Sequence, residues 1–161
     1  MRAIGKKEAR RMFGRLKEMF GRKKQPTVSY NRTEEYNRCR SNIMRVHHLV
    51  IVASGEEREV GLEDAVISSA AIDGLCDRIM DCPDWFSKAA VAIDYIANFH
   101  PFVEGNKRTA LQIAIRLLRN GGYELDDDDE TYLFIRNVAS GMYDREEVED
   151  WLRCNTHISS L

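Results

Sequence analysis

The chain of 161 residues (18.6 kDa) is 43% hydrophobic and 31% charged, which suits one globular domain with its own core. A net charge of −2 and a pI of about 6.1 argue against a uniformly basic nucleic-acid binder. No apolar run approaches the ~20 residues of a membrane-spanning helix, and we expect no secretory signal. The four cysteines form no C-x-x-C pair, so we expect reduced thiols in a cytoplasmic protein.

The first 25 residues are strongly basic. They hold ten Lys or Arg and two Glu, which leaves 14 basic and 24 acidic residues in the rest of the chain. Apolar residues from Ala9 to Phe20 recur at helical spacing and predict an amphipathic helix that ends before Pro26. Such a helix suits contact with nucleic acid, with an anionic membrane surface, with a partner protein or with the acidic remainder of its own chain. We assign residues 1–40 to this basic helix and its linker, and residues 41–161 to the main domain.

The pattern beyond Pro26 is helical almost throughout and predicts an all-α fold. Thr33 is placed to cap the first of these helices, and Asp144 with Glu147 forms a capping-box-like start for the last. The stretch 58–62 is expected to be irregular or hairpin-like. Helices are expected over about residues 33–53, 62–80, 85–99, 106–120 and 144–152.

Five consecutive acidic residues occupy positions 126–130. They would repel one another inside a helix, whereas at a helix start they oppose the positive end of the helix dipole. We therefore expect a helix start here, and a metal-binding acidic cluster is the alternative.

The most informative segment is residues 100–110, His-Pro-Phe-Val-Glu-Gly-Asn-Lys-Arg-Thr-Ala, followed by the apolar stretch 111–118. Because this stretch is apolar on nearly every face, it predicts a helix buried in the centre of the domain. The helix should begin near Asn106 and end at Gly121–Gly122. Its first turn offers unpaired N–H groups and a positive dipole end, which together favour an anion.

The loop that leads into this helix carries residue types suited to phosphate chemistry. Lys107 and Arg108 supply positive charge, and Gly105 allows a ligand close to the backbone. Glu104 among these cations suits Mg²⁺, the usual companion of a polyphosphate. His100 can accept a proton from an attacking hydroxyl near pH 7. Six such groups within nine positions favour phosphate-group chemistry over a merely solvated helix start.

Residues 100–108 resemble the signature loop of the Fic/Doc family, H-P-F-x-[DE]-[GA]-N-[GK]-R, at every fixed position. The resemblance extends over about residues 46–151 in the order of helices and implies an all-α fold with ATP bound over the loop. It also implies a small β-hairpin flap that holds the target, for which residues 58–62 and their neighbours are the candidate. His47 matches a position where the family often has His, and we expect it to be a structural hydrogen-bonding residue.

The family's roles transfer to this chain by position. The resemblance makes His100 the catalytic base and Glu104 the Mg²⁺ ligand. Asn106, with the backbone of Gly105 and Lys107, resembles the anion hole for the phosphates of ATP, and Arg108 resembles the clamp on them. Residues 41–161 are thereby expected to be a Fic/Doc-like catalytic domain.

Two positions indicate the branch. The AMP-transferring branch has Gly where this chain has Lys107, and a second Arg where it has Leu111. Both departures resemble the Doc branch, whose toxins phosphorylate a threonine of the translation factor Tu. No Ser or Thr is followed four residues later by Glu, so the family's self-inhibitory pattern [ST]-x-x-x-E-[GN] is missing. We therefore expect restraint from an antitoxin protein in trans.

Three functions follow as hypotheses. The first is a Doc-like toxin that transfers phosphate from ATP, with Mg²⁺, to a Thr or Ser hydroxyl of a target protein. The second is a Fic-type adenylyltransferase that transfers AMP to a Ser, Thr or Tyr hydroxyl. The third is a non-catalytic interaction module, which the intact His100, Glu104, Asn106 and Arg108 disfavour.

Overall fold

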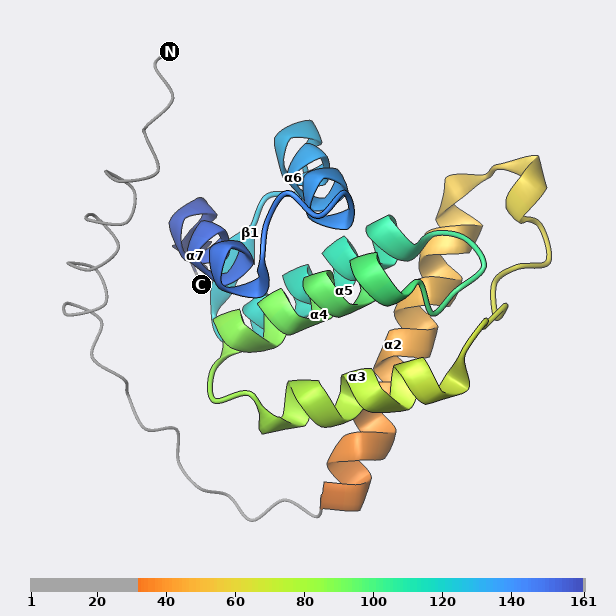
Figure 1. Ribbon diagram of the computed structural model, residues 1–161, viewed down its shortest axis with the longest axis horizontal. Helices are drawn as coiled ribbons and strands as arrows, with labels where there is room; N and C mark the ends of the chain where they lie inside the picture. The colour runs from red at the N-terminus through yellow and green to blue at the C-terminus, as the bar shows by residue number, and fades with distance from the viewer. Residues whose placement is uncertain (1–31, 161) are drawn as a thin grey trace. The chain divides into compact units, whose positions relative to one another are not determined.

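The structure is a computed structural model that describes residues 32–160, which belong to the unit formed by residues 31–161. The basic helix expected within residues 1–25 lies outside the described residues. In chain order the elements are α2 (Arg32–Ser54), the 3₁₀ helix η1 (Glu57–Glu59), α3 (Ser69–Asp81), α4 (Trp85–Phe99), α5 (Asn106–Asn120), β1 (Tyr123–Leu125), α6 (Asp129–Ala139), α7 (Arg145–Asn155) and β2 (Thr156–Ile158) (Figure 1). The all-α fold class is therefore confirmed. None of these helices combines the length and apolarity that a bilayer crossing requires.

Helices α4 and α5 form the centre of the described domain and pack against each other more extensively than any other pair (Figure 1). Helix α4 also contacts α3, α6 and α7, and helix α5 also contacts α2, α6 and β1. Four alanines of α4 are fully buried, and such short side chains let neighbouring helices approach closely. They are Ala89, Ala90, Ala92 and Ala97.

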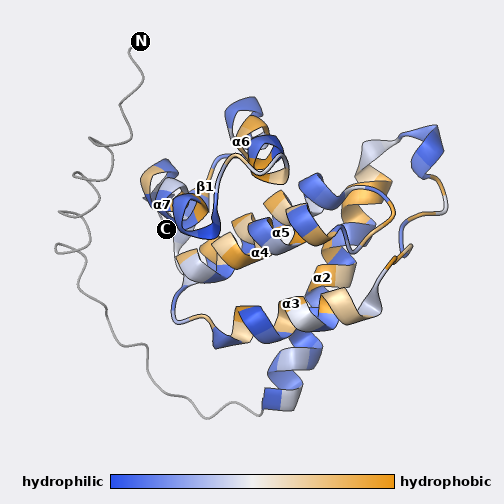
Figure 2. Ribbon diagram, in the orientation of Figure 1, coloured by the Kyte–Doolittle hydropathy of each residue, from blue (hydrophilic) through white to orange (hydrophobic). Residues whose placement is uncertain are grey.

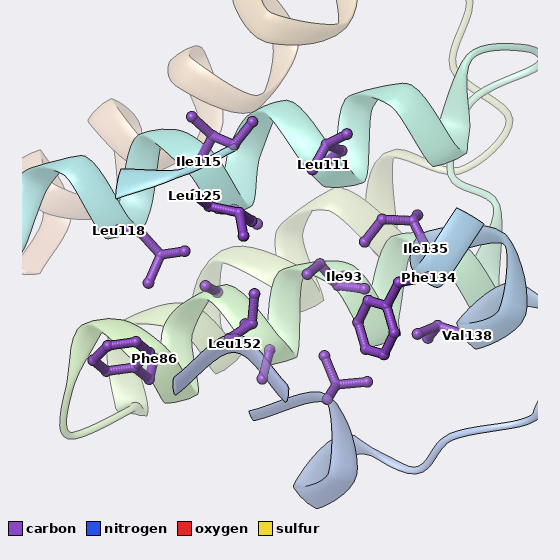
Figure 3. Packing of buried hydrophobic residues seen from close by; sticks show 14 of the residues in the cluster. Phe86, Ile93, Leu111, Ile115, Leu118, Leu125, Phe134, Ile135, Val138 and Leu152 are labelled. Carbon is purple, nitrogen blue, oxygen red and sulfur yellow. The ribbon is translucent and has the colours of Figure 1, made fainter. Parts of the chain in front are cut away.

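The α4–α5 pair separates two hydrophobic clusters. On one side, α4 and α5 pack against β1, α6 and α7, through residues that include Ile93, Leu118 and Ile135 (Figure 3). On the other side, they pack against α2 and α3, and Phe102 from the loop between α4 and α5 joins this cluster. Figure 2 shows hydrophobic and hydrophilic colours alternating along the helices, as in helices that bury one face. Because Phe102 belongs to the second cluster, the middle of the loop between α4 and α5 is anchored in the core.

Most helix starts follow from local capping chemistry. The Asp128 side chain accepts a hydrogen bond from the Thr131 N–H (2.8 Å), so α6 begins inside the acidic run as predicted. Asp144 and Glu147 form a reciprocal capping box at the start of α7, which is also confirmed. Asp84 forms a third capping box with Ser87 at the start of α4.

The stretch between α2 and α3 differs from expectation. The second helix was expected from about residue 62 but starts at Ser69, because the chain just before it hydrogen-bonds to the loop after α4 instead of continuing a helix. The Ile67 N–H donates to the Pro101 carbonyl (2.8 Å) and the Val103 N–H to the Ala65 carbonyl (3.2 Å). This pairing is a single bridge between Val66 and Phe102, and residues 57–59 form η1, so no hairpin stands at 58–62.

A two-stranded antiparallel sheet near the C-terminal end was not expected from the sequence. Tyr123 pairs with Ile158 and Leu125 with Thr156, which ties the chain after α5 to the chain after α7. Each strand is three residues long, too short for a clear alternation of polar and apolar side chains. The sheet lies away from the loop that carries the candidate site (Figure 1).

The Asp84 cap generates a stability prediction. Burial tends to raise the pKa of Asp84, but the Ser87 N–H and the Arg153 guanidinium (3.1 Å) outweigh it and lower that pKa. We expect Asp84→Ala to lower the free energy of unfolding by about 0.5–2 kcal/mol at pH 7. Asp84→Asn, which keeps the cap but loses the charge, should lower the free energy of unfolding by less than Asp84→Ala does.

The pH dependence follows from the lowered pKa. The ionic contribution of Asp84 is complete above the unfolded value of about 3.9 and is lost as the pH falls through the lower folded pKa. In urea denaturation, the difference in free energy of unfolding between wild type and Asp84→Asn should therefore disappear only in strong acid. A gap that is constant from pH 7 to pH 2 would contradict the ionic role.

Candidate active site

The loop between α4 and α5 turns sharply at two residues with positive φ. His100 ends α4 in the left-handed region (φ 45°, ψ 62°), and it is the one non-glycine residue with positive φ among residues 32–160. Such a conformation in a residue with a side chain is strained and is often found at functional sites. Gly105 has φ 74° directly before α5. The two turns place the His100 side chain and the start of α5 along one pocket.

The side chain of Asn106 braces the loop from within. Its Oδ1 accepts a hydrogen bond from the Phe102 N–H (3.0 Å), and its Nδ2 donates to the Phe102 carbonyl (2.8 Å). The amide is therefore used inside the loop. The resemblance assigned Asn106 to the anion hole, and its backbone N–H at the start of α5 is the part that stays available for that role.

Helix α2 holds the loop from its buried side. The His47 ring stacks on the Phe102 ring with centroids 3.8 Å apart, and its Nδ1 lies 3.3 Å from the Thr109 hydroxyl. Burial lowers the pKa of His47 and outweighs the opposing influence of the nearby Leu62 carbonyl. The ring is therefore neutral near pH 7. This agrees with the expected structural role of His47.

All six sequence-predicted site residues line one pocket of about 300 Å³. The loop and the first turn of α5 supply His100, Glu104, Gly105, Asn106, Lys107 and Arg108, together with Val103. Helix α5 makes its first internal hydrogen bond from the Thr109 N–H to the Gly105 carbonyl (2.8 Å), so the N–H groups of residues 106–108 precede its hydrogen-bond ladder. The pocket therefore joins a helix N-terminus, two cations, a carboxylate and an imidazole.

Three further residues line this pocket and come from elsewhere in the chain. Glu56 and Arg58 belong to the turn that contains η1, and Tyr132 belongs to the first turn of α6. The sequence analysis missed them. No local pattern places them near residue 100, because each depends on how α2 and α6 pack beside the loop.

An ion pair of Glu59 with Arg108 joins η1 to the first turn of α5. A carboxylate oxygen of Glu59 lies 2.5 Å from Nη2 of Arg108, and Glu59 is only 1% exposed. Burial would raise the pKa of Glu59, but the Ser54 hydroxyl beside it and the Arg108 guanidinium lower it instead. The self-inhibitory pattern places its Glu four residues after Ser or Thr, whereas Glu59 follows Ser54 by five. Arg108 is thus engaged within the chain.

Leu111, at the position where the AMP-transferring branch has its second arginine, does not line the pocket. Leu111 is 2% exposed and packs in the hydrophobic cluster between α4, α5 and α6. Lys107, in contrast, lines the pocket. The two residues that indicated the branch therefore differ in environment, since one contributes charge to the site and the other contributes to the core.

Two carboxylates line the pocket, those of Glu104 and Glu56. Among residues 32–160 no three His, Cys, Asp or Glu side chains are grouped as a metal site. In the acidic run, Asp127 accepts a hydrogen bond from Gln112 (2.5 Å) and Asp128 caps α6. Mg²⁺ commonly takes one or two protein carboxylates and completes its shell with phosphate oxygens and water. The donor set at Glu104 fits that mode of binding.

The fold and the loop define a helical domain in which a helix N-terminus, with N–H groups suited to an anion, shares a pocket with an imidazole. A family model, the Fic/DOC family, matches residues 12–118. The chain belongs to this family, whose members are typically transferases that move a nucleotide-derived group to a target protein. The match begins earlier and ends earlier than the resemblance over 46–151, so α6, α7 and Tyr132 lie beyond it. Among curated proteins, the comparison found no match.

The close contact at Gly105 generates a second prediction. A Cβ on Gly105 would lie 2.8 Å from Cδ1 of Ile51, and its φ of 74° disfavours any side chain. We expect Gly105→Ala to cost ~1–2 kcal/mol of backbone strain and a further ~1–3 kcal/mol of overpacking. Gly55→Ala is the matched control, because Gly55 has φ 65° and nothing within 4 Å of the added Cβ. Equal losses in urea denaturation would show that the contact with α2 is unimportant.

Proposed function

We propose that this chain is a Doc-like toxin that transfers the γ-phosphate of ATP to a Thr or Ser hydroxyl of a target protein. The observation that carries the proposal is Lys107 in the pocket beside His100, with Leu111 buried in the core. A lysine at this place adds positive charge around the transferred group, and no cation stands at position 111 to hold the rest of the nucleotide.

In the proposed reaction, each residue of the loop has one task. The imidazole of His100 takes the proton of the target hydroxyl, whose oxygen forms a bond to the γ-phosphorus. The bond from that phosphorus to the bridging oxygen breaks, and ADP leaves. Lys107, Arg108 and the backbone N–H groups at the start of α5 stabilise the charge of the phosphoryl oxygens.

Magnesium is part of the proposal. Glu104 would hold it against the phosphates. Bound Mg²⁺ would neutralise phosphate charge during transfer. We also propose that restraint comes from an antitoxin protein in trans, as the missing self-inhibitory pattern suggests. The target is proposed to be a cytoplasmic protein, such as a translation factor.

The His100 assignment is tested by substitution. His100→Ala should lower the rate of transfer by ~10²–10⁴-fold, because the hydroxyl keeps its proton. ATP affinity should change little, since the cations and the helix start remain. His157→Ala is the control, because His157 lies on β2 outside the pocket and pairs only with Glu124 (3.7 Å) among the ion pairs of the described residues. Undiminished transfer by His100→Ala would refute the role.

The reaction type is tested by the position of the label. Protein is incubated with Mg²⁺, proteins of a cell extract and ATP labelled at either the γ- or the α-phosphate. Label transferred only from the γ-position supports phosphate transfer, and label from the α-position would make the chain an adenylyltransferase. Lys107→Ala should lower kcat more than it changes KM, because charge on the transferred phosphoryl group changes in the transition state.

A further inference from the structure

The turn between α2 and α3 adds a third cation to the candidate site. Arg58 lines the same pocket as Lys107 and Arg108, although it comes from η1, far from the loop in the sequence. Its Nε lies 2.6 Å from a carboxylate oxygen of Glu56, which also lines the pocket. The turn thus places one cation and one exposed carboxylate at the pocket.

The Arg58–Glu56 pair is open to exchange. The side chain of Arg58 is 68% exposed and that of Glu56 is 46% exposed. Exposed ion pairs contribute only ~0–1 kcal/mol, because water solvates both charges and the long side chains lose freedom when paired. A phosphate with its higher charge and several oxygens can replace the Glu56 carboxylate, since the planar guanidinium matches phosphate oxygens in a bidentate way.

The neighbouring residue keeps Arg58 at the pocket. Glu59 is buried and bound to Arg108, so the backbone of η1 is fixed against the first turn of α5. Gly55 and Gly61 flank η1 with φ of 65° and 86°, which lets the chain turn sharply on both sides of it. Arg58 is therefore anchored through its backbone while its side chain stays accessible.

Beyond Lys107 and Arg108, helix α5 supplies no further cation to the pocket. Beyond its first turn, α5 directs Leu111 and Ile115 into the hydrophobic cluster, and Arg116 is exposed but does not line the pocket. Within the first turn, Arg108 already donates to Glu59. A polyphosphate in the pocket would therefore find Lys107 as the one loop cation with no ion pair in the described part of the chain.

We propose that Arg58 is a phosphate-binding residue of this pocket, which exchanges Glu56 for phosphate oxygens when the ligand binds. The inference rests on the proposed ATP site and adds a residue from outside the loop to it. In this proposal Glu56 lowers the affinity for the ligand, since its carboxylate competes with the ligand for Arg58.

The test measures the affinity of the full chain for ATP with Mg²⁺ by titration calorimetry. Arg58→Gln should weaken binding about 10- to 150-fold, the range for loss of charge-assisted hydrogen bonds of about 1.5–3 kcal/mol. Glu56→Gln should tighten binding about 2- to 5-fold, as expected when an exposed pair is removed. Arg116→Gln is the matched control for charge and should leave affinity unchanged.

The double variant separates exchange from a general change in charge. In the Arg58→Gln background, Glu56→Gln should raise the affinity for ATP much less than it does in wild type, because no guanidinium remains to be released. Arg58→Lys should restore part of the affinity, and the melting temperature of each variant checks folding. If wild type and Arg58→Gln bind ATP equally well, the role of Arg58 is refuted while the proposed function stands. A wild-type protein that binds no nucleotide would overturn the proposed function as well.

Discussion

Two hydrogen bonds between the Asn106 side chain and the Phe102 backbone hold the candidate site in shape. The chain leaves α4 through a strained His100 and must enter α5 six residues later, so the polar backbone of Phe102 becomes buried between them. An unpaired N–H or carbonyl there would cost about 1–3 kcal/mol, and the amide satisfies both. The Phe102 ring can then enter the core, where His47 stacks on it. The position of the whole loop depends on this brace.

The brace also decides which groups can meet a ligand. Because the Asn106 amide is turned inward, the pocket is served by backbone N–H groups at the start of α5 and by the side chains of Lys107, Arg108 and His100. Fixed N–H groups need no reorganisation when an anion arrives, and the dipole of α5 favours negative charge at that end. The Asn106 side chain thus serves the structure of the loop, and the side chains of its neighbours are left to face the pocket.

The sequence predicted what depends on local pattern, and it missed what depends on packing. Capping residues such as Asp144, and the apolar stretch after Asn106, act within one or two helical turns, so the helices and the site loop could be anticipated. Glu59 lies 49 positions from Arg108, and their pairing depends on the angle between α2 and α5. The late start of α3 has the same origin, because the N–H groups of Ile67 and Ser68 are held by the Pro101 carbonyl, which no local pattern in the sequence indicates.

The turn at η1 carries two ion pairs of opposite character. Glu59–Arg108 is buried on the carboxylate side, and removing one partner of such a pair strands a charge in a medium that solvates it poorly. Glu56–Arg58 is exposed on both sides and can be broken at little cost. An arginine has five N–H donors, so Arg108 can keep its bond to Glu59 and still direct other donors towards the pocket. The buried pair therefore holds the turn in place, and the exposed pair can exchange its partners at little cost.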